Sequence, residues 1–115
     1  ENIRRTAEVA ALFADSGSVA IVSLISPFAD ERRRAREIHE ERGLPFYEIF
    51  LDTSLQECER RDPKGLYARA RRGEIRHFTG IDSPYERPEK PDVVIRPADG
   101  LPADTAAAVL AELGL

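Results

Sequence analysis

The chain has 115 residues, of which 42% are hydrophobic and 33% are charged, and its formal net charge is −4. This length suits one small domain or part of one, and the composition is typical of a soluble globular protein. No apolar run approaches the roughly 20 residues that a membrane-spanning helix needs, so the sequence predicts no transmembrane segment and no membrane partner.

The first 42 residues predict two helices on either side of a buried strand. An amphipathic helix is expected over residues 2–14, with Ile3, Ala7, Ala10 and Ala14 on one face and Val9 and Phe13 beside them. The almost continuous apolar run over residues 19–25 favours a strand that is buried on both faces, as in a parallel sheet. A polar helix follows over residues 30–42, with Ala35 and Ile38 directed toward the core and its arginines toward water.

The alternation of strands and helices continues to the end of the chain. The pattern predicts, in order, a strand over residues 46–51, a helix capped by Asp52 and Thr53 that runs to about Arg61, a proline-rich loop over residues 83–91, a strand over residues 93–95 and a helix from Pro102. The buried stripe of this last helix is expected at Ala106, Val109, Leu110 and Leu113. Such alternation predicts an α/β domain with a parallel sheet covered by helices on both faces.

The order of the elements predicts a domain that is incomplete at its N-terminus. Folds of this class commonly open on a strand whose following loop binds phosphate, whereas this chain opens on a helix. Three strands are also few for such a sheet. No GxxxxGK[ST] phosphate loop occurs in the chain, so these residues alone are expected to be inactive in nucleotide phosphate transfer.

The most informative stretch is a basic segment that runs from Asp62 to Tyr85. Residues 60–76 hold seven Lys or Arg against two acidic side chains, a local net of +5 in a chain whose total is −4. A confined positive patch in an acidic protein favours a specific polyanionic ligand over nucleic acid, because nucleic-acid binders usually spread their basic surface widely.

Two glycines predict that this segment forms a mobile lid over about residues 62–82. Gly65 and Gly73 bracket a short basic helix, which would swing as a unit about residues with free backbone torsions. Arg69, Arg71 and Arg72 would then cover a phosphoryl group. The alternative interpretation is an exposed helix held by salt bridges.

Several single residues have both a binding and a structural interpretation. Phe78 could stack on a purine or anchor the lid by packing. Ser26, at the carboxyl end of the first predicted strand, could contact a phosphoryl group or cap the next helix. Cys58 is interpreted as a packed thiol, and His39 and His77 share no metal-ligand spacing with it, so no metal site is predicted. A single cysteine and the lack of a signal-peptide pattern favour a cytoplasmic protein.

Six stretches are similar, in order and in spacing, to one enzyme family. They are residues 1–5 (ENIRR), 12–15 (LFAD), 25–28 (ISPF), 44–46 (LPF), 58–67 (CERRDPKGLY) and 78–85 (FTGIDSPY). Through them the chain resembles adenylylsulfate kinase, which phosphorylates the ribose 3′-hydroxyl of adenosine 5′-phosphosulfate (APS). The resemblance implies a P-loop NTPase-type kinase fold, ATP with Mg²⁺ as donor, and the 3′-phosphorylated product PAPS with ADP. The family's phosphate loop would precede Glu1.

The resemblance also implies roles for individual residues. Phe78 would stack on the APS adenine and Lys64 would meet the anionic groups of APS. Arg61 would lie near the ATP adenine, together with the loop around Gly100. The whole APS site would comprise Asn2, Ile25, Ser26, Lys64, His77 and Phe78. At His77 several family members have a smaller residue.

The candidate catalytic residues are Ser26 and Lys64. Some family members are assigned a phosphoserine intermediate at the serine that matches Ser26, and direct in-line transfer is the simpler alternative. The resemblance further implies a homodimer, fusion to or association with ATP sulfurylase, and a place in sulfate assimilation. Two other functions stay open: a non-catalytic nucleotide-binding module, and a nucleoside monophosphate kinase with the same type of lid.

Overall fold

The computed structural model describes every residue from Glu1 to Leu115, and the chain divides into two compact units. One unit comprises residues 1–47 and 84–88, and the other comprises residues 48–83 and 89–115. None of the helices combines the length and the apolar character that crossing a membrane requires.

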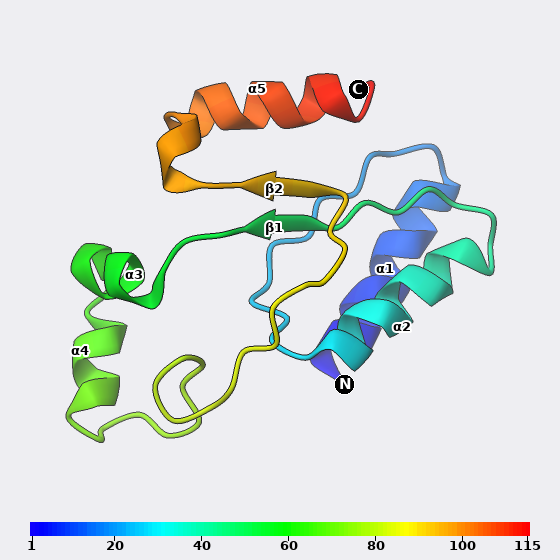
Figure 1. The fold of residues 1–115 in the computed structure, drawn as a ribbon. Helices are drawn as coiled ribbons and strands as arrows, with labels where there is room; N and C mark the ends of the chain where they lie inside the picture. The colour runs from blue at the N-terminus through cyan, green and yellow to red at the C-terminus, as the bar shows by residue number, and fades with distance from the viewer. The chain divides into compact units, whose positions relative to one another are not determined.

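The first unit is built on two packed helices, α1 (Asn2–Asp15) and α2 (Ala29–Glu40), shown in blue and cyan in Figure 1. Their contact buries Ala7 and Ala11 of α1 against Ile38 of α2, with Ala35 and Leu44 packed at the edge. Alanine side chains let the two helix backbones approach closely. Both predicted helices are therefore confirmed, and so is the inward position of Ala35 and Ile38.

The buried face of α1 agrees with the predicted one at Ala7 and Ala10 but differs from it at Val9 and Phe13. The sequence pattern groups Val9 and Phe13 with the alanines, but these two side chains are 53% and 57% exposed. The buried positions are Ala7, Ala10 and Ala11. Because α1 has one stripe of small and one of large apolar residues, the pattern alone does not select the stripe that meets α2.

Residues 19–25 do not form the predicted strand. The segment has no ladder partner, and its side chains are exposed, with Ile21 at 85% and Ile25 at 67%. An apolar run indicates where burial would be favourable, but a strand exists only where a neighbouring backbone supplies hydrogen bonds. The sheet accordingly has two strands rather than three.

The second unit contains this sheet, formed by β1 (Ile49–Leu51) and β2 (Val93–Ile95), which pair in parallel with Phe50 opposite Val94. Phe50 and Val93 are buried, so the α/β class with a parallel sheet is confirmed. At the start of the ladder the Asp92 carboxylate accepts a hydrogen bond from the Glu48 N–H, and the Asp92 N–H donates to the Glu48 carbonyl at 2.8 Å.

Strand β1 is shorter than the strand predicted over residues 46–51, because its partner β2 is short. Pro91 has no N–H to donate, so the ladder cannot extend beyond Asp92 in that direction. The strand expected over residues 46–51 is therefore confined to Ile49–Leu51.

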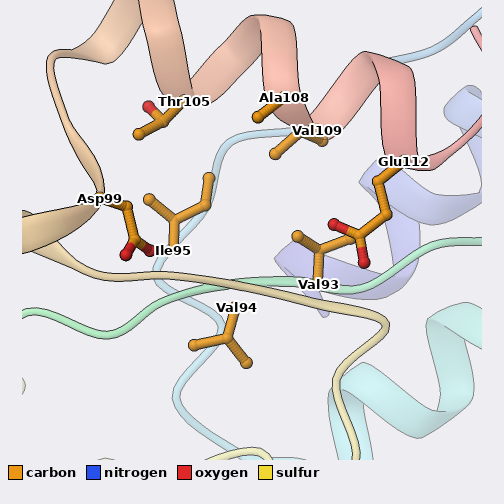
Figure 2. A pocket seen from close by; sticks show the side chains of 8 residues that line it. All are labelled: Val93, Val94, Ile95, Asp99, Thr105, Ala108, Val109 and Glu112. Carbon is orange, nitrogen blue, oxygen red and sulfur yellow. The ribbon is translucent and has the colours of Figure 1, made fainter.

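The rest of this unit consists of helices. They are α3 (Leu55–Arg61), α4 (Leu66–Arg71), the short 3₁₀ turn η1 (Pro97–Asp99) and α5 (Pro102–Glu112). Figure 2 shows α5 lying along β2, where Val93 and Ile95 point toward the helix and Val94 points away.

The face of α5 that meets β2 is rotated from the predicted stripe. Of the four predicted positions only Val109 is buried, and Leu110 is 44% exposed. The side chains that face β2 are Thr105, Ala108, Val109 and Glu112. This helix is apolar on nearly every side, so periodicity distinguishes its faces poorly.

Candidate functional site

The centre of the lid segment is a tight corner between α3 and α4. Helix α3 begins with Ser54, whose Oγ accepts a hydrogen bond from the Glu57 N–H at 3.1 Å. The predicted cap at Asp52 and Thr53 is therefore wrong by one residue. The sequence Ser-Leu-Gln-Glu from Ser54 is a capping-box pattern that would have located the helix start.

Asp62 follows the last residue of α3 and binds backbone N–H groups in the first turn of α4. Its carboxylate accepts hydrogen bonds from the N–H groups of Tyr67 at 3.0 Å and Ala68 at 3.1 Å, and its carbonyl accepts one from Gly65 at 3.0 Å. Asp62 is held at φ 25° and Gly65 at φ 66°, both in the left-handed region. Lys64 lies at the exposed tip of this corner, with its backbone fixed by the turn.

Three glutamates pair with five of the arginines on which the predicted lid depends. Glu57 Oε1 lies 2.5 Å from Arg60 Nη2 and 2.8 Å from Arg61 Nε. Glu59 accepts two hydrogen bonds from Arg71, the shorter at 2.6 Å. Glu74 pairs with Arg69 and with Arg72, each at 3.2 Å.

These hydrogen bonds change the acidity of the three carboxyls. Donation from Arg60 and Arg61 lowers the pKa of Glu57 from 4.5 to about 2. The hydrogen bond from Arg71 lowers the pKa of Glu59, and those from Arg72 and Arg69 lower the pKa of Glu74. All three carboxylates are therefore ionised at neutral pH.

The local net charge of +5 holds for residues 60–76, but two of the glutamates that pair with these arginines, Glu57 and Glu59, lie just before this range. Residues 57–76 hold seven basic and four acidic side chains, a net of +3. Among the seven cations only Lys64 and Arg76 have no hydrogen bond or ion pair within the protein. The structure therefore adds Arg76, which the sequence analysis did not single out, to Lys64 as an unpaired cation.

Phe78 is partly buried and meets an aromatic neighbour. Its ring centroid lies 4.9 Å from that of Tyr67, with the two planes at 74°, an edge-on contact. Burial raises the pKa of the Tyr67 phenol, and the nearby Cys58 side chain raises it further. Cys58 is half-buried beside this ring, consistent with its interpretation as a packed thiol.

The loop after Phe78 is organised by Asp82. The Asp82 carboxylate accepts hydrogen bonds from the N–H groups of His77 at 2.9 Å and Phe78 at 2.5 Å, which lower the pKa of Asp82. Gly80 has φ 87°, and a Cβ built there would lie 3.0 Å from Leu55 Cδ1. Glycine is favoured here by its backbone angle, and any larger residue would also press on the Leu55 side chain of α3.

Ser26 belongs to the other unit and does not cap α2. The α2 N-cap position is Phe28, and the N–H of Ala29 donates instead to Glu86 Oε1 at 2.8 Å. The Ser26 carbonyl accepts a hydrogen bond from Arg32 Nη1 at 2.5 Å, while its hydroxyl has no partner within the protein. The capping interpretation is therefore wrong, because the Glu86 side chain takes that place.

Ser26 also has an unusual backbone. Its φ is 47°, and it is one of three non-glycine residues with positive φ, together with Asp62 and His77. Such conformations in non-glycine residues cost free energy and cluster at functional sites. Two of the three are residues that the sequence analysis assigned to the APS site.

The predicted site residues are divided between the two units. Asn2, Ile25 and Ser26 belong to the first unit; Arg61, Lys64, His77, Phe78 and Gly100 belong to the second. Asn2 opens α1, Ile25 is 67% exposed, and Gly100, at φ 126°, separates η1 from α5. The convergence of the two groups on one ligand stays a prediction.

One hollow in the second unit contains none of these residues. It is a shallow pocket of about 200 Å³ between β2 and α5, where Asp99 and Glu112 flank the valines of β2 (Figure 2). The structure contains no cluster of three His, Cys, Asp or Glu side chains that would hold a metal ion.

A parallel sheet flanked by helices, with a short basic helix beside it in the chain, is consistent with the P-loop kinase class of fold. A family model described as adenylylsulphate kinase matches residues 1–96. The chain belongs to the adenylylsulphate kinase family. Gly100 lies outside the residues that this family model matches.

Individual relatives agree with this assignment. The chain is 59% identical to the bifunctional enzyme CysN/CysC of Mycobacterium tuberculosis over 84% of its length, and 56% identical to the adenylyl-sulfate kinase of Emericella nidulans over 86%. A solved structure of the Mycobacterium tuberculosis APS kinase CysC in complex with AMPPNP and APS superposes with a TM-score of 0.95 at 53% identity, over 99% of this chain and 65% of that one. The chain spans 51% of the Emericella enzyme and 16% of the bifunctional enzyme.

Proposed function

We propose that this chain provides the APS pocket and the lid of an adenylylsulfate kinase, which transfers the ATP γ-phosphoryl group to the APS 3′-hydroxyl and gives PAPS and ADP. The observation that carries this proposal is family membership over residues 1–96. It is supported by the likeness to the Mycobacterium tuberculosis kinase, whose solved structure holds AMPPNP and APS.

The lid contributes cations and an aromatic ring to APS. Lys64 and Arg76 are the side chains proposed for the anionic groups, because no carboxylate in the protein competes for them. Phe78 stacks on the adenine. Three arginines are already paired with glutamates: Arg69 and Arg72 with Glu74, and Arg71 with Glu59. To contact the transferring phosphoryl group, each must leave its glutamate and bind phosphate oxygens instead.

The first unit contributes the polar end of the APS site. Asn2, Ile25 and Ser26 are proposed to line it, with His77 completing it from the lid. The Ser26 hydroxyl has no protein partner and is free to donate to substrate. Direct in-line transfer to the 3′-hydroxyl is proposed, because it needs no covalent intermediate on the enzyme.

The ATP side of the site needs residues beyond these. Residues 1–115 contain no GxxxxGK[ST] loop and no metal-ligand cluster, so they do not by themselves fit the Mg²⁺ that accompanies ATP. We propose that a phosphate loop preceding Glu1 completes the kinase domain and supplies those contacts, while Arg61 and the loop around Gly100 border the ATP adenine.

The setting of the enzyme is proposed by analogy with relatives. Names such as CysN/CysC and NodQ describe bifunctional proteins, which supports fusion to or association with ATP sulfurylase. A homodimer and a cytoplasmic location belong to the same proposal.

Labelled-phosphate transfer tests the substrate. The full-length protein is incubated with γ-labelled ATP and Mg²⁺, with APS, AMP, adenosine or shikimate as acceptor. The proposal expects labelled product with APS alone. Preferred labelling of AMP would support a nucleoside monophosphate kinase, and binding of APS without transfer to any acceptor would support a non-catalytic module.

A further inference from the structure

Phe78 is the residue on which adenine recognition depends in the proposed function, and its ring is not free in the structure. The Tyr67 ring lies edge-on to it, with centroids 4.9 Å apart and planes at 74°. This separation and angle fall within the range in which aromatic pairs attract each other. A perpendicular contact leaves at least one face of the Phe78 ring uncovered by Tyr67, which is the face that a purine needs.

Tyr67 has a fixed position from which to hold that ring. Its N–H donates to Asp62 Oδ1 at 3.0 Å, in the first turn of α4. Its side chain is partly buried, and the Cys58 side chain of α3 lies near enough to raise the pKa of its phenol. The backbone hydrogen bond and the partial burial of the ring therefore hold Tyr67 at the corner between α3 and α4.

The backbone of Phe78 is fixed independently. The Asp82 carboxylate accepts hydrogen bonds from the Phe78 and His77 N–H groups, and the Phe78 carbonyl accepts hydrogen bonds from Ile81, Asp82 and Ser83, each at 3.1 Å. With its backbone held in this way, Phe78 can vary mainly in its side-chain torsions. The Tyr67 ring is the aromatic contact that restricts them.

We propose that Tyr67 is a positioning residue that holds the Phe78 ring in the orientation in which adenine stacks on it. This inference rests on the proposed function of Phe78. A ring that is already ordered loses less side-chain entropy when the ligand binds, so binding is tighter without any contact between Tyr67 and APS.

The kinetic test uses the full-length protein with Tyr67→Leu and Tyr67→Phe. Tyr67→Leu removes the aromatic edge, and we expect it to raise KM for APS roughly two- to tenfold, the range that one aromatic pair supplies. KM for ATP and kcat are expected to stay within about twofold. Tyr67→Phe keeps the ring and loses only the phenolic hydroxyl, so KM for APS is expected to stay at the wild-type value.

A double-mutant cycle separates positioning from a direct contact. In a Phe78→Leu background, Tyr67→Leu is expected to add nothing to KM for APS, because Tyr67 acts only through the ring that has been removed. Full additivity of the two effects would overturn the inference, and so would an unchanged KM in Tyr67→Leu when Phe78→Leu raises it. Failure of the wild-type protein to phosphorylate APS would instead refute the proposed function.

A measurement without substrate tests the same contact. In the NMR spectrum of the protein with labelled phenylalanine, Tyr67→Leu is expected to move the Phe78 ring resonances toward those of a freely rotating ring, with the other phenylalanines unchanged. Unchanged Phe78 resonances would overturn the inference. If Tyr67→Leu lowers the melting temperature by more than a few degrees, Tyr67→Met, which keeps an unbranched apolar side chain, takes its place.

Discussion

Arg71 and Glu59, which are 12 residues apart, join α4 to α3 through two hydrogen bonds, from Arg71 Nε to Glu59 Oε1 at 2.6 Å and from Arg71 Nη2 to Glu59 Oε2 at 3.2 Å. Pairs of this two-pronged geometry are the strongest that arginine and carboxylate form. An arginine predicted to face a phosphoryl group is therefore also part of the corner that shapes the lid.

The segment over residues 57–76 is expected to lose stability in acid. The pKa values of Glu57, Glu59 and Glu74 are lower in the folded protein than the ordinary 4.5, that of Glu57 being about 2. Groups with a lowered folded pKa stabilise the fold above their unfolded pKa, and this contribution is lost as the pH falls through the folded value. Amide hydrogen exchange over residues 57–76 is therefore expected to accelerate between pH 4.5 and 2, relative to residues 2–15, after correction for intrinsic rates. The expected acceleration is modest because the ion pairs are exposed. An equal acceleration of exchange in residues 57–76 and residues 2–15 would contradict the prediction.

Lys64 is expected to matter more for catalysis than Arg71. A hydrogen bond to a charged group contributes roughly 1.5–3 kcal/mol, so Lys64→Ala should lower kcat/KM for APS by about ten- to a hundredfold. Arg71→Ala should reduce it less, because Arg71 already has Glu59 as a partner. Lys90→Ala removes an exposed lysine outside the lid segment and serves as the control with the same charge change. Equal losses of kcat/KM for APS in Lys64→Ala and Lys90→Ala would show that the effect depends on net charge and not on the position of Lys64.

Ser26→Ala is expected to retain turnover. In-line transfer needs no covalent intermediate on the enzyme, so loss of the hydroxyl removes at most one hydrogen bond to substrate, worth about 1 kcal/mol. Steady-state kcat is expected to fall less than tenfold. Complete loss of turnover in a variant that still binds APS would instead establish an obligatory phosphoserine. Ser23→Ala in the preceding extended segment is the matched control.

Gly80→Ala is expected to destabilise the protein more than Gly73→Ala. Both glycines have positive φ, 87° and 77°, which costs alanine roughly 1–2 kcal/mol at either position. Only at Gly80 does the added methyl group meet another residue, Leu55 Cδ1 at 3.0 Å, while nothing lies within 4 Å at Gly73. Urea unfolding measures the difference, and a Leu55→Ala background should remove it. Equal losses in the wild-type background would mean that the loop does not contact α3 as described.

The sequence predicted the helices and one strand well because these depend on local signals. The pattern located α1, α2, α4, β2 and the Pro102 start of α5 to within about two residues. It failed at residues 19–25, where strand formation depends on a partner backbone that no local pattern reveals. It also failed on the buried face of α5, because a helix rich in alanine on all sides gives periodicity little to distinguish.

The candidate site was predictable in its residue types but not in its pairing. The basic run from Arg60 to Arg76 is visible in the sequence, yet Glu59 meets Arg71 only because the chain turns between α3 and α4 at Asp62. The same corner brings Tyr67 to Phe78, a contact across 11 positions that spacing alone does not indicate. Only the structure shows that Lys64 and Arg76 are unpaired while the five other arginines of this segment pair with glutamates.

The most direct test of the account is the position of the transferred phosphate. The full-length protein is given γ-labelled ATP, Mg²⁺ and either APS or its 3′-deoxy analogue, and the labelled nucleotide is identified by chromatography and ³¹P NMR. The account predicts a 3′-phosphorylated product from APS and no labelled product from the 3′-deoxy analogue. Equal labelling of both acceptors, or no labelling of APS, would contradict it.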